Sequence, residues 1–87
     1  MKCYEFNDNC GVRFWVAAPD MKTACDYAQA VCDEDPDLYS VRVLTPAQAE
    51  TIAILDDDNV NTNAAVMLHR QNEENPGRCA LLAHSEA

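Results

Sequence analysis

The sequence predicts an α+β fold: a small single domain over residues 1–87, with an antiparallel sheet packed against two or three helices. Two observations predict this class. In some segments apolar and polar residues alternate, as along a half-buried strand, and in others the apolar residues recur at helical spacing. No repeat, low-complexity stretch or linker separates these segments, and a chain of 87 residues has room for one thin core. We expect the sheet to combine an N-terminal hairpin with a central and a C-terminal strand.

The expected hairpin consists of residues 2–7 (KCYEFN) and 12–17 (VRFWVA). Both segments alternate, and DNCG between them supplies turn residues. Trp15 points to the opposite side of its strand from Phe14 and Val16, which we expect to face the first helix. Either the second helix or the C-terminal segment covers Trp15 as a second core layer, or this ring anchors a dimer or a partner protein.

The next segment, PDMKTACDYAQAVC, changes to helical spacing. Asp20 is placed to cap the first turn by accepting hydrogen bonds from its free amides. We therefore expect a helix over residues 21–32. Its apolar stripe consists of Met21, Ala24, Cys25, Ala28, Val31 and Cys32.

A third strand and a second helix are expected in the middle of the chain. Residues 38–45 (LYSVRVLT) alternate and are rich in β-branched side chains, which favours a strand. Thr45 then caps a helix, with Pro46 at the first helical position and Gln48 completing a capping box. We expect this helix to run to about Leu55.

The last third of the chain leaves two alternatives. A helix capped near Thr62 could end at residues 75–77 (NPG), or residues 65–71 could form a strand that pairs with the C-terminal segment. We favour the helix, because AAVML is made of adequate helix formers. Residues 78–84 are expected to form the final strand.

The charge of the chain is strongly one-sided, with 15 acids, 6 bases and a formal net charge of −9. Such a surface repels nucleic acid and anionic membranes and is attracted to basic grooves on other proteins. No segment has the apolar core of a signal peptide or the roughly 18 apolar residues of a membrane span. We expect a cytoplasmic protein that contacts neither membranes nor nucleic acid directly.

Two acidic runs, CDEDPD and DDDN, hold almost half of the acids. Each follows the end of a predicted helix, where the helix dipole disfavours a carboxylate by roughly 0.3–1 kcal/mol, so local stability does not explain them. If the two helices run parallel, both runs share one rim and could imitate a row of phosphates. The alternative is that they are solvated loops. With Trp15, the expected partner-binding residues are Asp33, Glu34, Asp35, Asp37, Asp56, Asp57 and Asp58.

The residues that could bind a metal do not follow a metal-binding pattern. Asp57, Asn59 and Asn61 match alternate positions of a calcium loop, but Thr62 stands where glycine is needed and Leu68 where a bidentate glutamate is needed. The five cysteines and two histidines include no closely spaced cysteine pair of the zinc type. Free cysteines that fill the core account better for the thiols. We expect no metal and no cofactor.

Catalytic patterns are also absent from the sequence. Gly11 and Gly77 are the only glycines, so no glycine-rich phosphate loop exists. Cys10 is in a turn without a basic neighbour to activate its thiol, and nothing places a histidine beside it. We therefore expect a protein that is not an enzyme.

The chain combines small size, acidity, a strand hairpin (MKCYEFNDNCGVRFWVAA), a capped helix (PDMKTACDYAQAVC) and further α/β elements. In this plan it resembles small orphan proteins encoded by phages and mobile elements, and it is similar to some anti-CRISPR proteins. Several of those are acidic and block the nucleic-acid-binding surface of a bacterial Cas complex. The resemblance covers the plan of the chain and no motif, so no functional residue carries over from it.

Charge and resemblance together lead to one expected function. The protein would be a non-enzymatic inhibitor that binds a basic surface of a Cas complex, or of another bacterial protein, and blocks access of nucleic acid. The alternative is a structural or assembly protein that forms a homodimer through the sheet face bearing Trp15.

Overall fold

The computed structural model of the protein describes residues 1–8, 10–55 and 61–85. A four-stranded antiparallel sheet of order β3-β1-β2-β6 forms its centre, and β4 and β5 make a separate antiparallel pair. This arrangement confirms the predicted α+β class. The elements are β1 (Lys2–Asn7), β2 (Arg13–Ala18), α1 (Met21–Ala30), the 3₁₀ turn η1 (Pro36–Leu38), β3 (Ser40–Leu44), α2 (Pro46–Glu50), β4 (Ala53–Leu55), β5 (Asn61–Asn63), α3 (Ala64–Glu74) and β6 (Ala80–Ser85).

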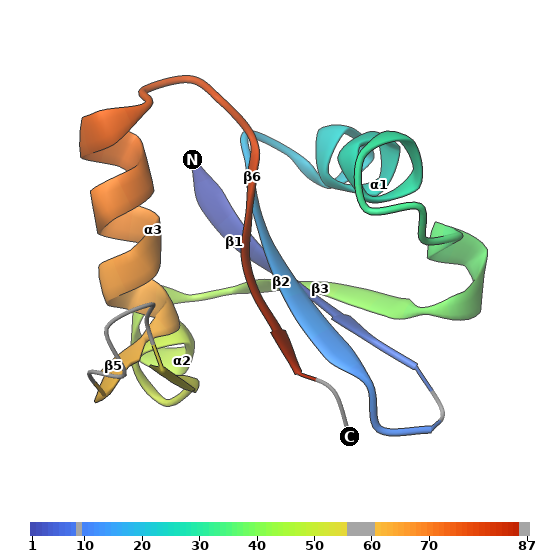
Figure 1. Ribbon diagram of the computed structural model, residues 1–87, viewed down its shortest axis with the longest axis horizontal. Helices are drawn as coiled ribbons and strands as arrows, with labels where there is room; N and C mark the ends of the chain where they lie inside the picture. The colour runs from blue at the N-terminus through green and yellow to red at the C-terminus, as the bar shows by residue number, and fades with distance from the viewer. Residues whose placement is uncertain (9, 56–60, 86–87) are drawn as a thin grey trace.

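The helices cover both faces of the sheet, with α1 on one side and α2 and α3 on the other (Figure 1). Both faces of the central strands are therefore buried, which removes the polar face that a one-sided sheet would show. One core, under α1, contains Tyr4, Phe6, Phe14, Val16, Ala18, Ala24 and Ala28. The other core, under α2 and α3, contains Cys3, Trp15, Ala17, Leu44, Ala49, Ile54, Ala64 and Leu82.

The hairpin and the first helix form as the sequence predicts. β1 and β2 pair with Glu5 opposite Trp15, and Phe6 stacks on Phe14 with ring centroids 4.5 Å apart. Asp20 caps α1, accepting a hydrogen bond from the Thr23 amide at 2.8 Å. The helix ends at Ala30, within two residues of the predicted end, which is the usual uncertainty of a helix terminus.

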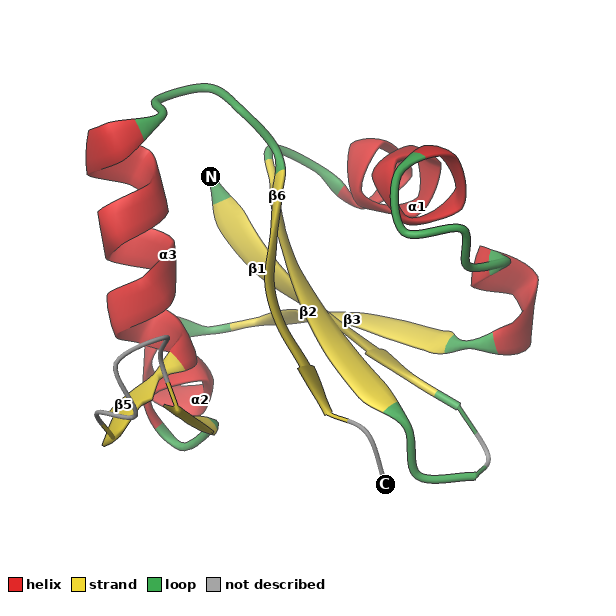
Figure 2. Cartoon of the chain, viewed as in Figure 1, coloured by secondary structure: helices red, strands yellow, loops and turns green. Residues whose placement is uncertain are grey.

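The second helix is shorter than predicted. Its capping box forms, since Thr45 and Gln48 exchange hydrogen bonds of 2.9 and 3.2 Å, but α2 ends at Glu50. The Thr51 hydroxyl donates to the Gln48 carbonyl at 2.6 Å, and Ala53–Leu55 then pairs as a strand with Asn61–Asn63 (Figure 2). The predicted continuation to Leu55 is wrong because residues 51–55 (TIAIL) contain β-branched side chains, which fit a strand better than a helix.

The last third follows the helical alternative. α3 begins after Asn63, whose side chain accepts from the Val66 amide at 3.0 Å, so the cap is one residue later than Thr62. β6 adds to the edge of β2 and completes the sheet. Within the described parts of the chain, no helix has the length and apolar character needed to cross a lipid bilayer.

Candidate functional site

The first acidic run lies between α1 and β3 (Figure 1), and residues 33–37 (DEDPD) are called the acidic segment below. Its backbone turns sharply at the helix end, since Asp33 has a φ of 55° and the Glu34 amide donates to the Ala28 carbonyl at 3.0 Å. Aspartate tolerates this left-handed conformation better than most residues, although glycine adopts it at lower cost. The segment is therefore a defined turn with a hydrogen bond back to α1.

Two of its four carboxylates hold the segment in place. Glu34 accepts a hydrogen bond of 2.6 Å from the Tyr39 hydroxyl, and the Tyr39 ring meets Phe14 edge-on at 5.1 Å, within the core under α1. Asp35 caps η1 by accepting from the Asp37 amide at 3.0 Å. The hydrogen bond to Glu34, followed by burial, raises the pKa of Tyr39 to about 12, so this donor stays protonated at neutral pH. The acidic segment is therefore held by two hydrogen bonds, one through Glu34 and one through Asp35.

The other two carboxylates, of Asp33 and Asp37, point to solvent. Both residues are exposed, and within the described residues no hydrogen bond or ion pair engages either side-chain carboxylate. Lys22 is the single base among residues 19–39, which also contain six acids, and it pairs with Asp26 at 3.3 Å. Residues 19–39, which include α1 and the acidic segment, therefore carry a net charge of −5 out of −9.

Two exposed apolar side chains flank the acidic segment. Val31, at the end of α1, is 64% exposed, and Leu38, at the end of η1, is 69% exposed. Single exposed apolar residues are common on protein surfaces. Here, however, they lie on each side of unpaired carboxylates, which is the mixture of apolar and charged groups that protein interfaces use. The exposed residues of this stretch are Val31, Asp33, Asp35, Asp37 and Leu38.

The second acidic run, Asp56, Asp57 and Asp58, lies outside the described residues. The expectation that this run directly follows the end of the second helix is wrong, since α2 stops at Glu50 and β4 comes next, and α2 packs on the opposite sheet face from α1. The acidic segment precedes the N-terminal end of β3, whereas α2 begins just beyond the C-terminal end of that strand (Figure 1).

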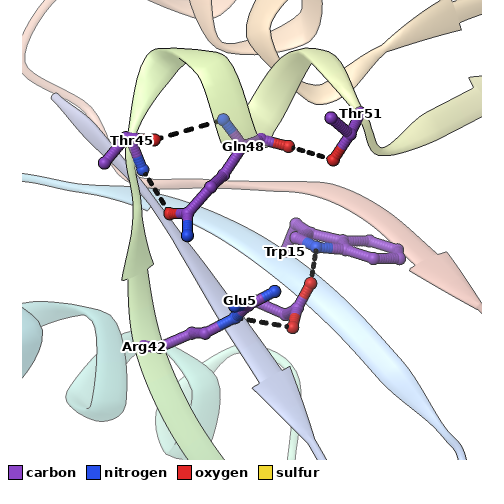
Figure 3. A network of polar contacts seen from close by, with 6 residues as sticks. All are labelled: Glu5, Trp15, Arg42, Thr45, Gln48 and Thr51. Carbon is purple, nitrogen blue, oxygen red and sulfur yellow. Dashed lines mark hydrogen bonds and ion pairs between the residues drawn. The ribbon is translucent and has the colours of Figure 1, made fainter.

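Trp15 is buried, with 4% of its surface exposed, in the core under α2 and α3. Its indole Nε1 donates to Glu5 Oε2 at 3.0 Å, and Arg42 Nε donates to Glu5 Oε1 at 3.0 Å (Figure 3). Of the two alternatives for Trp15, the second core layer is therefore confirmed. A ring that is this buried offers almost no surface to a dimer or a partner.

Reasoning from the sequence missed the Glu5–Arg42 pair. Glu5 is 3% exposed and lies in the middle of a strand, and its partner is 37 positions away in the chain. An acid within an alternating apolar strand is a signal that a buried base or donor exists elsewhere, but it does not identify that partner. The pairing depends on the register between β1 and β3, in which Glu5 lies opposite Arg42.

The thiols are all free, and burial changes the acidity of three of them. All five cysteines are free, and burial together with the nearby Glu5 charge raises the pKa of Cys3 to about 11. The pKa values of Cys25 and Cys32 are also raised, mainly by burial. These three thiols are therefore poor nucleophiles at neutral pH. Among the described residues, no three His, Cys, Asp or Glu side chains come together as metal ligands.

Comparison with known proteins gives no family assignment. No protein-family model matches the chain, and neither a curated protein nor a solved structure matches it. The candidate site therefore depends on the geometry of the acidic segment alone.

Proposed function

We propose that the protein is a non-enzymatic inhibitor that binds a basic surface of another protein through the acidic segment and so keeps nucleic acid away from that surface. The observation that carries the proposal is that two carboxylates of the segment are hydrogen-bonded within the protein and the other two are exposed. Glu34 and Asp35 fix the segment, while Asp33 and Asp37 are exposed and unpaired in the described structure. Because the backbone that carries these two exposed carboxylates is already fixed, the segment loses less conformational freedom when it binds a partner.

The partner would present lysine and arginine side chains that otherwise hold phosphates. Carboxylates that pair with these groups compete with nucleic acid by occlusion, and the association is fast and salt-sensitive. The exposed Val31 and Leu38 favour a protein partner, because they can bury apolar area against apolar side chains that lie between the lysines and arginines of that partner. A bacterial CRISPR–Cas complex is one class of protein with such a surface.

The test is affinity capture from a bacterial lysate with the wild-type protein and with a variant carrying Asp33→Asn and Asp37→Asn. We expect wild type to retain a basic nucleic-acid-binding protein, and added nucleic acid to release it. Two rim ion pairs contribute on the order of 1.4 kcal/mol together, so the double variant should bind about tenfold more weakly.

The matched control carries Glu50→Gln and Glu74→Gln, which removes two exposed charges on the α2 and α3 side of the sheet. It should bind the partner as wild type does. A further variant with Asp56, Asp57 and Asp58 changed to Asn tests the second acidic run. If capture persists in the Asp33/Asp37 variant at raised salt, the acidic segment is not the contact and the proposal is wrong.

A further inference from the structure

A small polar pocket lies on the other face of the sheet from α1, at the end that α2 and α3 leave open. α2 and α3 cover Cys3, Ala17 and Leu44, whereas the opposite ends of the same three strands are exposed. The pocket has a volume of about 260 Å³, below the roughly 300–1,000 Å³ of sites for drug-sized ligands. It is lined by Glu5, Asn7, Arg13, Ser40, Val41 and Arg42.

The strand register brings these side chains together. Asn7 on β1 lies opposite Arg13 on β2 and Ser40 on β3, and Glu5 lies opposite Arg42. Since side chains two positions apart share a face, the two arginines flank the β1 residues from the two neighbouring strands. This places two guanidinium groups, one amide and one hydroxyl around one pocket.

Arg42 is held in place by the buried carboxylate beneath the pocket. Both Glu5 oxygens are occupied, one by Arg42 Nε and the other by the Trp15 indole (Figure 3). Arg42 donates its Nε to Glu5, 56% of its side chain is exposed, and among the described residues no hydrogen bond engages its terminal amino groups. A guanidinium held through Nε has less freedom to lose when it binds a second acidic group.

Arg13 is the second cation of the pocket and is not needed to neutralise Glu5. Its guanidinium carbon lies 5.6 Å from the centroid of the Trp15 ring, and no ion pair of Arg13 occurs among the described residues. In the same described part of the chain, no hydrogen bond engages the side chain of Asn7 or Ser40. With two arginines and one glutamate, the pocket has a local charge of +1 inside a molecule of −9.

We propose that this pocket binds the oxyanion group, phosphate or carboxylate, of a small ligand or of a chain end. Guanidinium groups bind both kinds of oxyanion through paired N–H donors, and the amide of Asn7 and the hydroxyl of Ser40 add donors from β1 and β3. Because the molecule as a whole repels anions, binding depends on these directed hydrogen bonds and not on long-range attraction. The site is separate from the acidic segment and does not depend on its role.

The single tryptophan makes the site measurable, since Arg13 lies over its ring and Glu5 accepts from its indole N–H. The indole N–H signal of the intact protein is followed by NMR during titration with inorganic phosphate and, separately, with acetate, at constant ionic strength. We expect the signal to move saturably with at least one of the two anions. The anion that binds more tightly identifies the phosphate or the carboxylate as the ligand group.

Arg13→Gln removes one positive charge from the pocket. Its matched control, Lys22→Gln, removes one positive charge from α1, outside the pocket. Arg13→Gln should weaken binding at least tenfold, and Lys22→Gln should leave it within twofold of wild type. Asn7→Ala with Ser40→Ala keeps every charge and should also weaken binding, with circular dichroism confirming that each variant is folded. A shift that never saturates, or equal weakening in Arg13→Gln and Lys22→Gln, would overturn the proposal.

Discussion

Glu5 is a charged residue within a strand that is buried on both faces, and its two oxygens accept one hydrogen bond each, from Trp15 and Arg42. A buried carboxylate is costly unless its hydrogen-bonding capacity is met, and loss of one partner leaves that cost uncompensated. The network therefore fixes the register of three strands, because any slip of β3 or β2 would separate Glu5 from a donor.

Arg42→Met tests this network at the level of one residue. The substitution keeps an unbranched apolar side chain as far as the position of Nε and removes the Nε–H donor to Glu5, so we expect the free energy of unfolding to fall by about 2 kcal/mol. Urea denaturation of the variant measures the change. Glu5→Gln combined with Arg42→Met should cost less than the sum of the two single changes, and strictly additive effects would show that the pair does not interact.

At the scale of elements, several signals that lie within a few residues predicted the structure correctly. The alternation of β1 and β2, the Asp20 cap of α1 and the capping box of α2 all form as expected. The prediction for residues 51–55 failed because a short, mostly apolar run fits the end of a helix and a strand equally well. The pairing of β4 with β5 decides between them, and the sequence gives no local sign of it.

The left-handed backbone conformation of Asp33, just after α1, leads to a prediction about stability. Asp33→Gly should raise the free energy of unfolding by about 0.5–1 kcal/mol, because glycine adopts the left-handed conformation at this position without the steric cost of a side chain. Thermal unfolding measures the gain. Asp35→Gly removes the same charge nearby but also the acceptor of the Asp37 amide, so it should destabilise the protein. A loss of stability in Asp33→Gly would contradict the role given to this turn.

At the scale of the whole molecule, the sequence offered a second core layer over Trp15 as one of two alternatives but could not decide between them. The charge of the acidic segment is evident from residues 33–37, but whether it meets the second run depends on which sheet face each helix covers. The polar pocket was missed for the same reason, since its residues come from three strands and join only through their register. Contacts between segments that are distant in the sequence decide both the sheet face that each helix covers and the register that assembles the pocket.

The pH dependence of stability also belongs to the whole fold, because groups from both cores contribute to it. The pKa of Cys3 rises from 9.0 to about 11 through burial, and that of Tyr39 from 10.0 to about 12 through its hydrogen bond to Glu34. A raised folded pKa favours the protonated group, so this stabilisation is complete below the unfolded values and is lost as pH rises through the folded ones.

We therefore expect the free energy of unfolding to decline between about pH 9 and pH 12. Urea denaturation across this range measures the decline. Tyr39→Phe should reduce its upper part, and Cys3→Ala its lower part, since each removes one titrating group. An unchanged profile in both variants would show that other groups control alkaline unfolding.

The order of strands in the sheet has a consequence for synthesis of the chain. β1 and β2 form the middle of the sheet, yet both precede β3 and β6, which become its borders. During synthesis, the β1–β2 hairpin exists before β3 and β6 are made, so the outer backbone amides and carbonyls of both strands are unpaired. In this state a strand of a neighbouring chain can pair with either edge. β6 follows every other strand in the chain, so β2 remains open to such misjoining until residues 80–85 have been synthesised.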